Sequence, residues 1–175
     1  MHTMLRRHLV GSMRAVEACA LLLALPLGAM RAQSSASTPV RDSVLTVVNH
    51  FFSAMESRDT AALREMLLTD GHTVAMSNRG DSTSVRTRPN GDFIGFVAQR
   101  SERLRERIWE PQVLQRGAMA LVWAPYDFYL DHTFSHCGVD SFTLARTGTG
   151  WRIVDVAFTI EPTGCAPSPL GPRPE

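Results

Sequence analysis

The chain has 175 residues, with 18 Arg, no Lys and 17 Asp plus Glu, so its formal net charge is only +1. This near-neutral composition, without a basic patch, argues against nucleic acid as a partner. The length suits one compact domain once a leader is removed, and no internal repeat divides the sequence.

Residues 1–32 have the three parts of a secretory signal peptide. Arg6, Arg7 and Arg14 precede the apolar run 18–29, and cleavage is expected after Ala32. An apolar run of about twelve residues is too short to span a bilayer comfortably, although an uncleaved N-terminal anchor stays an alternative. We therefore expect a periplasmic or secreted protein that has no membrane association after leader cleavage.

Residues 33–39 read as a polar linker, and a single domain is expected over 40–162. Thr38 and Pro39 are typical of a helix start, with Thr38 as the cap, and apolar residues then recur at helical spacing to about Ser57. A second, shorter helix is predicted from Asp59 to about residue 70. The segments "HTVAMSN" and "STSVRT" predict a hairpin, and a third helix is predicted from "PNGDF" to about Arg103.

The second half of the chain is rich in strand-forming residues. Four such segments, 107–117, 118–131, 133–147 and 150–162, are separated by short turns, which predicts an antiparallel meander. Pro111 and Pro125 are expected at edges or bulges. Three N-terminal helices packed in a strongly curved antiparallel sheet make an α+β fold. The tail, 163–175, is rich in proline and is expected to be extended or disordered.

The strand "SHCGVDSFTL", residues 135–144, has an unusual face. Because side chains alternate along a strand, His136 and Asp140 share one face with Phe142 and Leu144. Cys137 lies on the other face. In an exported protein that has lost Cys19 with its leader, Cys137 and Cys165 form an even pair, which favours a disulfide. Two free thiols remain the alternative.

The order of elements resembles the nuclear transport factor 2-like superfamily, and in particular its small exported SnoaL-like or lumazine-binding-like members. The segments "VVNHFFSAMESRDTAAL", "MALVWAPYDFYLD", "SHCGVDSFTL" and "GWRIVDVAFT" carry the resemblance, which covers most of residues 40–160. It implies a cone-shaped fold with a cavity at its open end. Phe142 and Leu144 would then lie deep in the cone, and His136 and Asp140 near its mouth.

A ligand site is expected in this cavity. The candidate ligand-binding residues are Tyr126, Phe128, His136, Asp140, Phe142 and His72. An apolar pocket with a few convergent polar groups is the usual form of a small-molecule site. No cofactor is expected. No metal site is expected either, because His132, His136 and Asp140 follow one another at intervals of about 13 Å along a strand, too far apart to share one ion.

Three functions stay open. The first is binding of an unknown small, largely apolar molecule, without chemistry. The second is an enzyme like SnoaL or ketosteroid isomerase, in which Asp140 is the general base and Tyr126 or His136 donates a hydrogen bond. The third is a non-catalytic dimeric scaffold. The resemblance also implies a homodimer formed through the outer face of the sheet, where Trp123 is expected.

Overall fold

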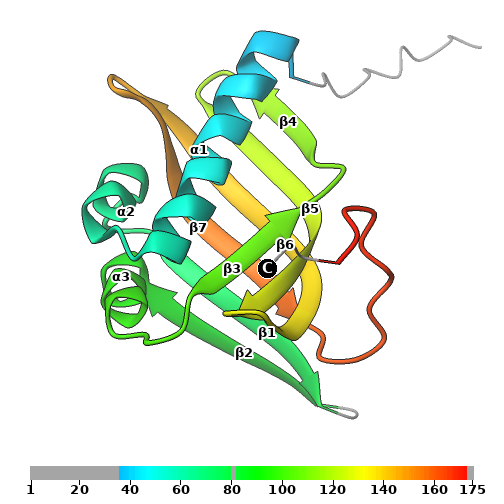
Figure 1. Cartoon of the computed structure of the whole chain (residues 1–175). Coiled ribbons are helices and arrows are strands. Elements are labelled where there is room, and N and C mark those ends of the chain that lie inside the picture. The colour runs from blue at the N-terminus through cyan, green and yellow to red at the C-terminus, as the bar shows by residue number, and fades with distance from the viewer. Residues whose placement is uncertain (1–35, 80–81, 173–175) are drawn as a thin grey trace, which may run out of the picture. The chain divides into compact units, whose positions relative to one another are not determined.

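A computed structural model describes residues 36–79 and 82–172, and the predicted leader lies outside these residues. Three helices pack on one seven-stranded sheet (Figure 1). The helices are α1 (Thr38–Ser57), α2 (Thr60–Met66) and α3 (Asn90–Ala98). The strands are β1 (His72–Arg79), β2 (Ser82–Pro89), β3 (Leu104–Ile108), β4 (Gln112–Arg116), β5 (Met119–Leu130), β6 (Thr133–Thr147) and β7 (Gly150–Ile160). The predicted α+β class is confirmed.

Local sequence signals set the helix boundaries. Helix α1 begins at Thr38, the residue predicted as its cap, because Ser37 takes the N-cap position and Pro39 lies in the first turn. It ends where Arg58 adopts a left-handed conformation, and the side chain of Asp59 then accepts hydrogen bonds from the first backbone N–H groups of α2. Helix α3 ends at Ala98, earlier than predicted.

The sheet is curved, as predicted, and mixed, because one pair of its strands is parallel. The strand order is β2-β1-β7-β6-β5-β3, with β4 also paired to β5. The predicted hairpin is present as β1–β2, but β1 joins the sheet by a parallel pairing with β7. The other strand pairs are antiparallel.

The first predicted β segment is two strands. Glu110, at φ 47°, and Pro111 break it, so that β3 and β4 pair with different halves of β5. Pro125 lies in β5 between these two halves. Its missing N–H therefore falls where no ladder bond is needed. Pro125 is thus tolerated in an interior strand, at neither of the expected positions, an edge or a bulge.

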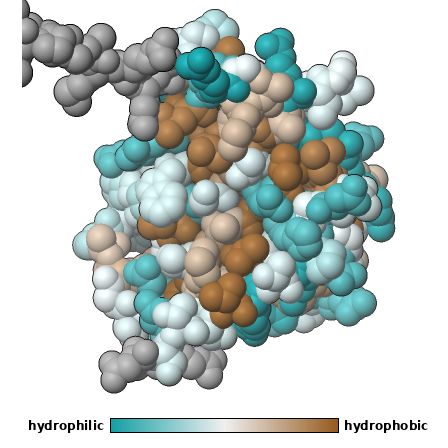
Figure 2. Space-filling model, turned by 180° about the vertical axis from the view of Figure 1, so that it is seen from behind, coloured by the Kyte–Doolittle hydropathy of each residue, from teal (hydrophilic) through white to brown (hydrophobic). Residues whose placement is uncertain are grey.

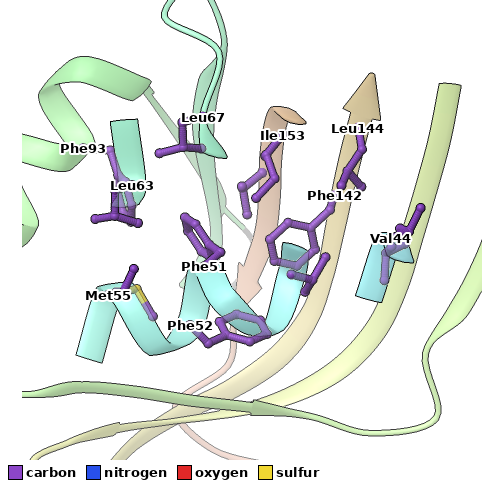
Figure 3. Close-up of a cluster of buried hydrophobic side chains, with 14 of the residues drawn as sticks. Val44, Phe51, Phe52, Met55, Leu63, Leu67, Phe93, Phe142, Leu144 and Ile153 are labelled. Carbon is purple, nitrogen blue, oxygen red and sulfur yellow. The ribbon is translucent and has the colours of Figure 1, made fainter. Parts of the chain in front are cut away.

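The hydrophobic core lies between α1 and the sheet (Figure 3). Phe51 and Phe52 of α1 make edge-to-face contacts with Phe142 of β6, at ring-centroid distances of 5.8 Å and 5.7 Å. Leu144 and Ile153 continue this cluster and are fully buried. This core fills one end of the space that the curved sheet encloses and leaves the other end open.

The predicted disulfide is confirmed. Cys137 of β6 is bonded to Cys165 in the tail, with a Cα–Cα distance of 5.9 Å. The bond folds the tail back beside the sheet, and the Cys137 backbone also exchanges two hydrogen bonds with Glu161. No helix in the described part of the chain is long and apolar enough to cross a membrane.

Candidate functional site

A cavity of about 610 Å³ lies at the open end of the curved sheet. Helices α1 and α3 supply aromatic and thioether side chains to it, and strands β1, β5 and β7 add further apolar groups. These are Phe51, Met55, Phe93, Phe96, Ala75, Phe128, Val156 and Phe158. Polar groups reach the cavity at two places, an acidic one formed by β3 and β6 and a basic one formed by β2 and the segment after α3. A cavity of this size and composition can hold a small molecule.

Asp140 is the central polar group of the acidic place. Asp140 is only 1% exposed. In the register of the sheet it lies opposite Ala124 of β5 and Phe158 of β7. Burial raises the pKa of Asp140 to about 7. Its side chain interacts with one neighbouring carboxyl group.

That neighbour is Glu106 of β3. Burial and the nearby Asp140 carboxylate raise the pKa of Glu106 well above its usual range. Two ionised carboxylates cannot donate to each other, but a protonated Glu106 can donate a hydrogen bond to Asp140. Near neutral pH the pair therefore shares at least one proton.

His136 lines the same cavity and lies four residues before Asp140 on β6. Its ring stacks on Phe128, with centroids 4.8 Å apart, and meets the Tyr126 ring edge-on. Burial lowers the pKa of His136 to about 4, so the imidazole is neutral at neutral pH. Its Nδ1 lies 3.0 Å from the Ser135 hydroxyl. When Nδ1 accepts that hydrogen, Nε2 carries the proton and serves as a donor.

Tyr126 lines the cavity, but its hydroxyl group is engaged elsewhere. It donates a 2.6 Å hydrogen bond to the backbone oxygen of Thr159. Burial, followed by the nearby carboxyl groups, raises the pKa of Tyr126 above its ordinary value. The phenol is thus a protonated, internally paired group, and His136 is the better-placed donor.

The basic place holds Arg86 and Arg88 of β2 and Arg100 after α3. The guanidinium carbons of Arg88 and Arg100 stand 4.4 Å and 4.9 Å from the centroid of the Phe96 ring. No carboxylate oxygen of the described residues lies within ion-pair distance of these three arginines. Cation–π contacts thus hold two of the charges at the cavity without neutralising them.

Residues 39–159 match the model of a family described as putative lumazine-binding. The chain belongs to this family. Its matched part includes the acid pair, His136 and the three arginines, and it ends before Cys165. No curated protein matches the sequence significantly.

Several solved structures described as nuclear transport factor 2-like are similar to this chain. A nuclear transport factor 2-like protein from Cytophaga hutchinsonii is 15% identical, with a TM-score of 0.59 over 69% of this chain and 97% of that chain. A similar protein from Novosphingobium aromaticivorans is 17% identical, with a TM-score of 0.57 over 73% and 85%. A protein described as a putative dehydratase, from Streptomyces avermitilis, is 16% identical, with a TM-score of 0.53 over 73% and 98%. Likeness at such identities shows the nuclear transport factor 2-like fold alone.

In this family member, four of the predicted ligand-binding residues lie together. Tyr126, Phe128, His136 and Asp140 all line the cavity. Phe142 does not line it, because Phe51 and Phe52 cover its ring in the core.

His72 also lies away from the cavity lining. Thr73 and Ala75 of β1 face the cavity, so the alternation of the strand turns His72 outward. There its ring nitrogen lies 3.8 Å from Asp155. No group of three or more His, Cys, Asp or Glu side chains in the described residues is arranged to hold a metal ion.

Sequence reasoning missed Glu106 and the three arginines of the cavity. A signal for Glu106 exists, since it stands between Leu104 and Ile108 on one face of a short strand. Arg86 and Arg88 likewise share a face of β2. What the sequence does not show is that these faces converge on Asp140 and Phe96, which requires the tertiary fold.

Proposed function

We propose that this domain is an exported protein that binds a small, largely apolar molecule in its cavity. The observation that carries the proposal is the 610 Å³ space walled by aromatic and aliphatic side chains, with the buried Glu106–Asp140 carboxyl pair on one side of it. A largely apolar cavity containing a few directed polar groups favours an apolar ligand that makes one or two specific hydrogen bonds. The family description as putative lumazine-binding also supports a ligand-binding role.

Export is part of the proposal. It is supported by the signal-peptide pattern of residues 1–32 and by the Cys137–Cys165 disulfide. Proteins of an oxidising compartment keep such bonds, whereas cytosolic thiols stay reduced. Fractionation of host cells, followed by mass determination of the mature N-terminus, tests it. Full-length protein in the cytosol would contradict it.

Binding is tested with the neutral fluorophore N-phenyl-naphthylamine, whose emission rises in apolar surroundings. We expect saturable binding by the wild-type domain. Ala75→Phe, which fills the cavity from β1, should weaken this binding at least about tenfold because the ring occupies the ligand's volume. The matched control is Leu114→Phe on the exposed face of β4. Failure of the wild type to bind, or equal binding by both variants, would contradict the proposal.

The acid pair supports a second candidate function, proton transfer. With a pKa of about 7, Asp140 is poised to accept a proton at neutral pH. It would take the proton from a carbon next to a carbonyl group, and the enolate oxygen would accept a hydrogen bond from His136. Protonated Glu106 would hold the Asp140 carboxylate in place.

Hydrogen–deuterium exchange of the α-protons of tetralone, followed by NMR, tests this candidate. Wild-type protein should accelerate exchange, and Asp140→Asn should abolish the acceleration while the protein stays folded. His136→Gln, which keeps a donor, should retain part of it. If wild-type protein does not accelerate exchange, or if Asp140→Asn exchanges as fast as wild type, the carboxyl group serves ligand binding or structure.

A further inference from the structure

The basic place of the cavity has no function in the proposal above. Arg86, Arg88 and Arg100 bring three positive charges to one side of the cavity, away from the Glu106–Asp140 pair. Arg86 and Arg88 are exposed on β2 and Arg100 is partly buried, and three unpaired positive charges at one site repel each other. Their grouping therefore calls for a negative partner that the described chain does not supply.

The fold holds these arginines in place. In the register of the sheet, Arg88 lies opposite Thr73, and Arg86 lies opposite Ala75; both of these β1 residues line the cavity. Arg88 and Arg100 stand at the ring of Phe96, which restricts the two flexible side chains. In addition, the Nε atom of Arg100 is buried and has no hydrogen-bond partner among the described residues. A buried donor without a partner is costly, so a ligand atom that accepts from it would be favoured.

The arginines and the acid pair lie on opposite sides of the apolar surface. In the sheet, Arg86 and Asp140 belong to one cross-strand row that runs through Ala75 and Phe158. Three strand spacings separate them, or roughly 14 Å. A ligand spanning this distance would place an apolar body against Val156 and Phe158 and one end at each polar group.

We propose that the cavity selects an amphiphilic anion, in which an apolar body carries a carboxylate, sulfonate or phosphate head that Arg86, Arg88 and Arg100 bind. This inference rests on the proposed binding function and narrows its ligand class. Charge-assisted hydrogen bonds from guanidinium groups fit such heads, which offer two oxygens in one plane. The far end of the ligand meets the Glu106–Asp140 pair, which favours a hydroxyl or another donor there over a second anion.

The test compares two fluorophores of similar shape. Anilinonaphthalene sulfonate carries an anionic head, and N-phenyl-naphthylamine lacks it. We expect the sulfonate to bind wild-type protein at least about tenfold more tightly, as expected for one or two charge-assisted hydrogen bonds. Its affinity should fall with added salt, while that of the neutral compound should not.

Substitutions of the cavity arginines test whether these residues cause the preference for the sulfonate. The double variant Arg88→Gln/Arg100→Gln should remove the preference for the sulfonate, weakening sulfonate binding far more than binding of the neutral fluorophore. Arg88→Lys should keep most of this preference. Arg116→Gln, an exposed arginine of β4 outside the cavity, is the control. Circular dichroism confirms that each variant is folded.

The outcomes separate the two proposals. If the neutral fluorophore does not bind, the cavity-binding function itself is wrong. If it binds but the sulfonate binds no more tightly, or if the double variant keeps the preference, the anion inference is wrong while the binding function stands. If Ala75→Phe does not weaken sulfonate binding, the sulfonate occupies another surface, which also overturns the inference.

Discussion

Glu106 of β3 and Asp140 of β6 form a carboxyl pair inside the cavity, in which each side chain changes the proton affinity of the other. Their strands are separated in the sheet by β5, and the curvature of the sheet brings the two side chains together. Neither residue has an arginine among the groups that shift its pKa. The pair therefore stays partly protonated under conditions in which exposed carboxyl groups are fully ionised.

This pair predicts an unusual dependence of stability on pH. The folded-state pKa of Asp140, about 7, lies above the unfolded value of 3.8. The native state therefore binds more protons between these values, and Asp140 makes folding less favourable as pH rises through this window. Asp140→Asn removes the effect. We expect the variant to gain at least about 1 kcal/mol relative to wild type between pH 4 and pH 8.

Urea unfolding at several pH values measures this gain. His136 works in the opposite sense, because its folded pKa of about 4 lies below the ordinary 6.5, so that it lowers stability as pH falls from 6.5 to 4. The comparison between Asp140→Asn and wild type cancels this contribution. A difference in stability that does not change with pH would show that Asp140 ionises normally in the folded protein.

Gly138 is predicted to be indispensable for the packing of β6 on β7. A Cβ atom at this position would lie 2.6 Å from Oγ1 of Thr159 and still closer to the Thr159 backbone oxygen, which accepts the Tyr126 hydrogen bond. Gly138→Ala should therefore destabilise the protein by about 2 kcal/mol or more. Gly95→Ala in α3 is the control, since nothing lies within 4 Å of its added Cβ. The control should gain up to about 1 kcal/mol. The melting temperatures of both variants, compared with that of the wild type, measure these changes. A Gly138→Ala variant as stable as the wild type would contradict the prediction.

The disulfide between Cys137 and Cys165 should stabilise the domain. It closes a loop with a sequence separation of 28, for which the chain-entropy model gives about 3.6 kcal/mol. Cys137→Ser/Cys165→Ser should lower the free energy of unfolding by about this amount. Wild-type protein should lose the same stability in reductant, whereas the double variant should not respond to it. Equal stability of the two proteins without reductant would contradict the prediction.

The homodimer remains a prediction, and the outer face of the sheet offers a surface for it. Trp123, Met119 and Leu114, on β4 and β5, are 53%, 51% and 40% exposed. Figure 2, which views the molecule from behind, shows hydrophobic residues gathered in a band on this side. If the band is the interface, Trp123→Arg should convert dimer to monomer in analytical ultracentrifugation. Val85→Arg, an equally exposed apolar position on β2, should not. A wild-type monomer at micromolar concentration would contradict the prediction.

The sequence predicted those features that depend on neighbours along the chain. Helical spacing and the start signals at Pro39 and Asp59 identified the first two helices, and alternation placed His136 and Asp140 on one face. The parallel pairing of β1 with β7 was missed, because no local pattern distinguishes it from an antiparallel one. Phe142 was assigned to the ligand site because alternation gives the face of a strand but not the depth at which a helix covers it.

The parallel pairing of β1 with β7 also bears on the order in which the domain folds. It joins Thr73 to Val156, roughly 80 residues apart along the chain, whereas β5, β6 and β7 are linked by short turns. Closing so long a loop is entropically slow, so we expect the β5–β7 meander and α1 to fold first and the β1–β2 hairpin to dock last. The hairpin carries Arg86 and Arg88. The basic side of the cavity would then be the last part to form and the first to open, which gives a ligand a way in without unfolding the core.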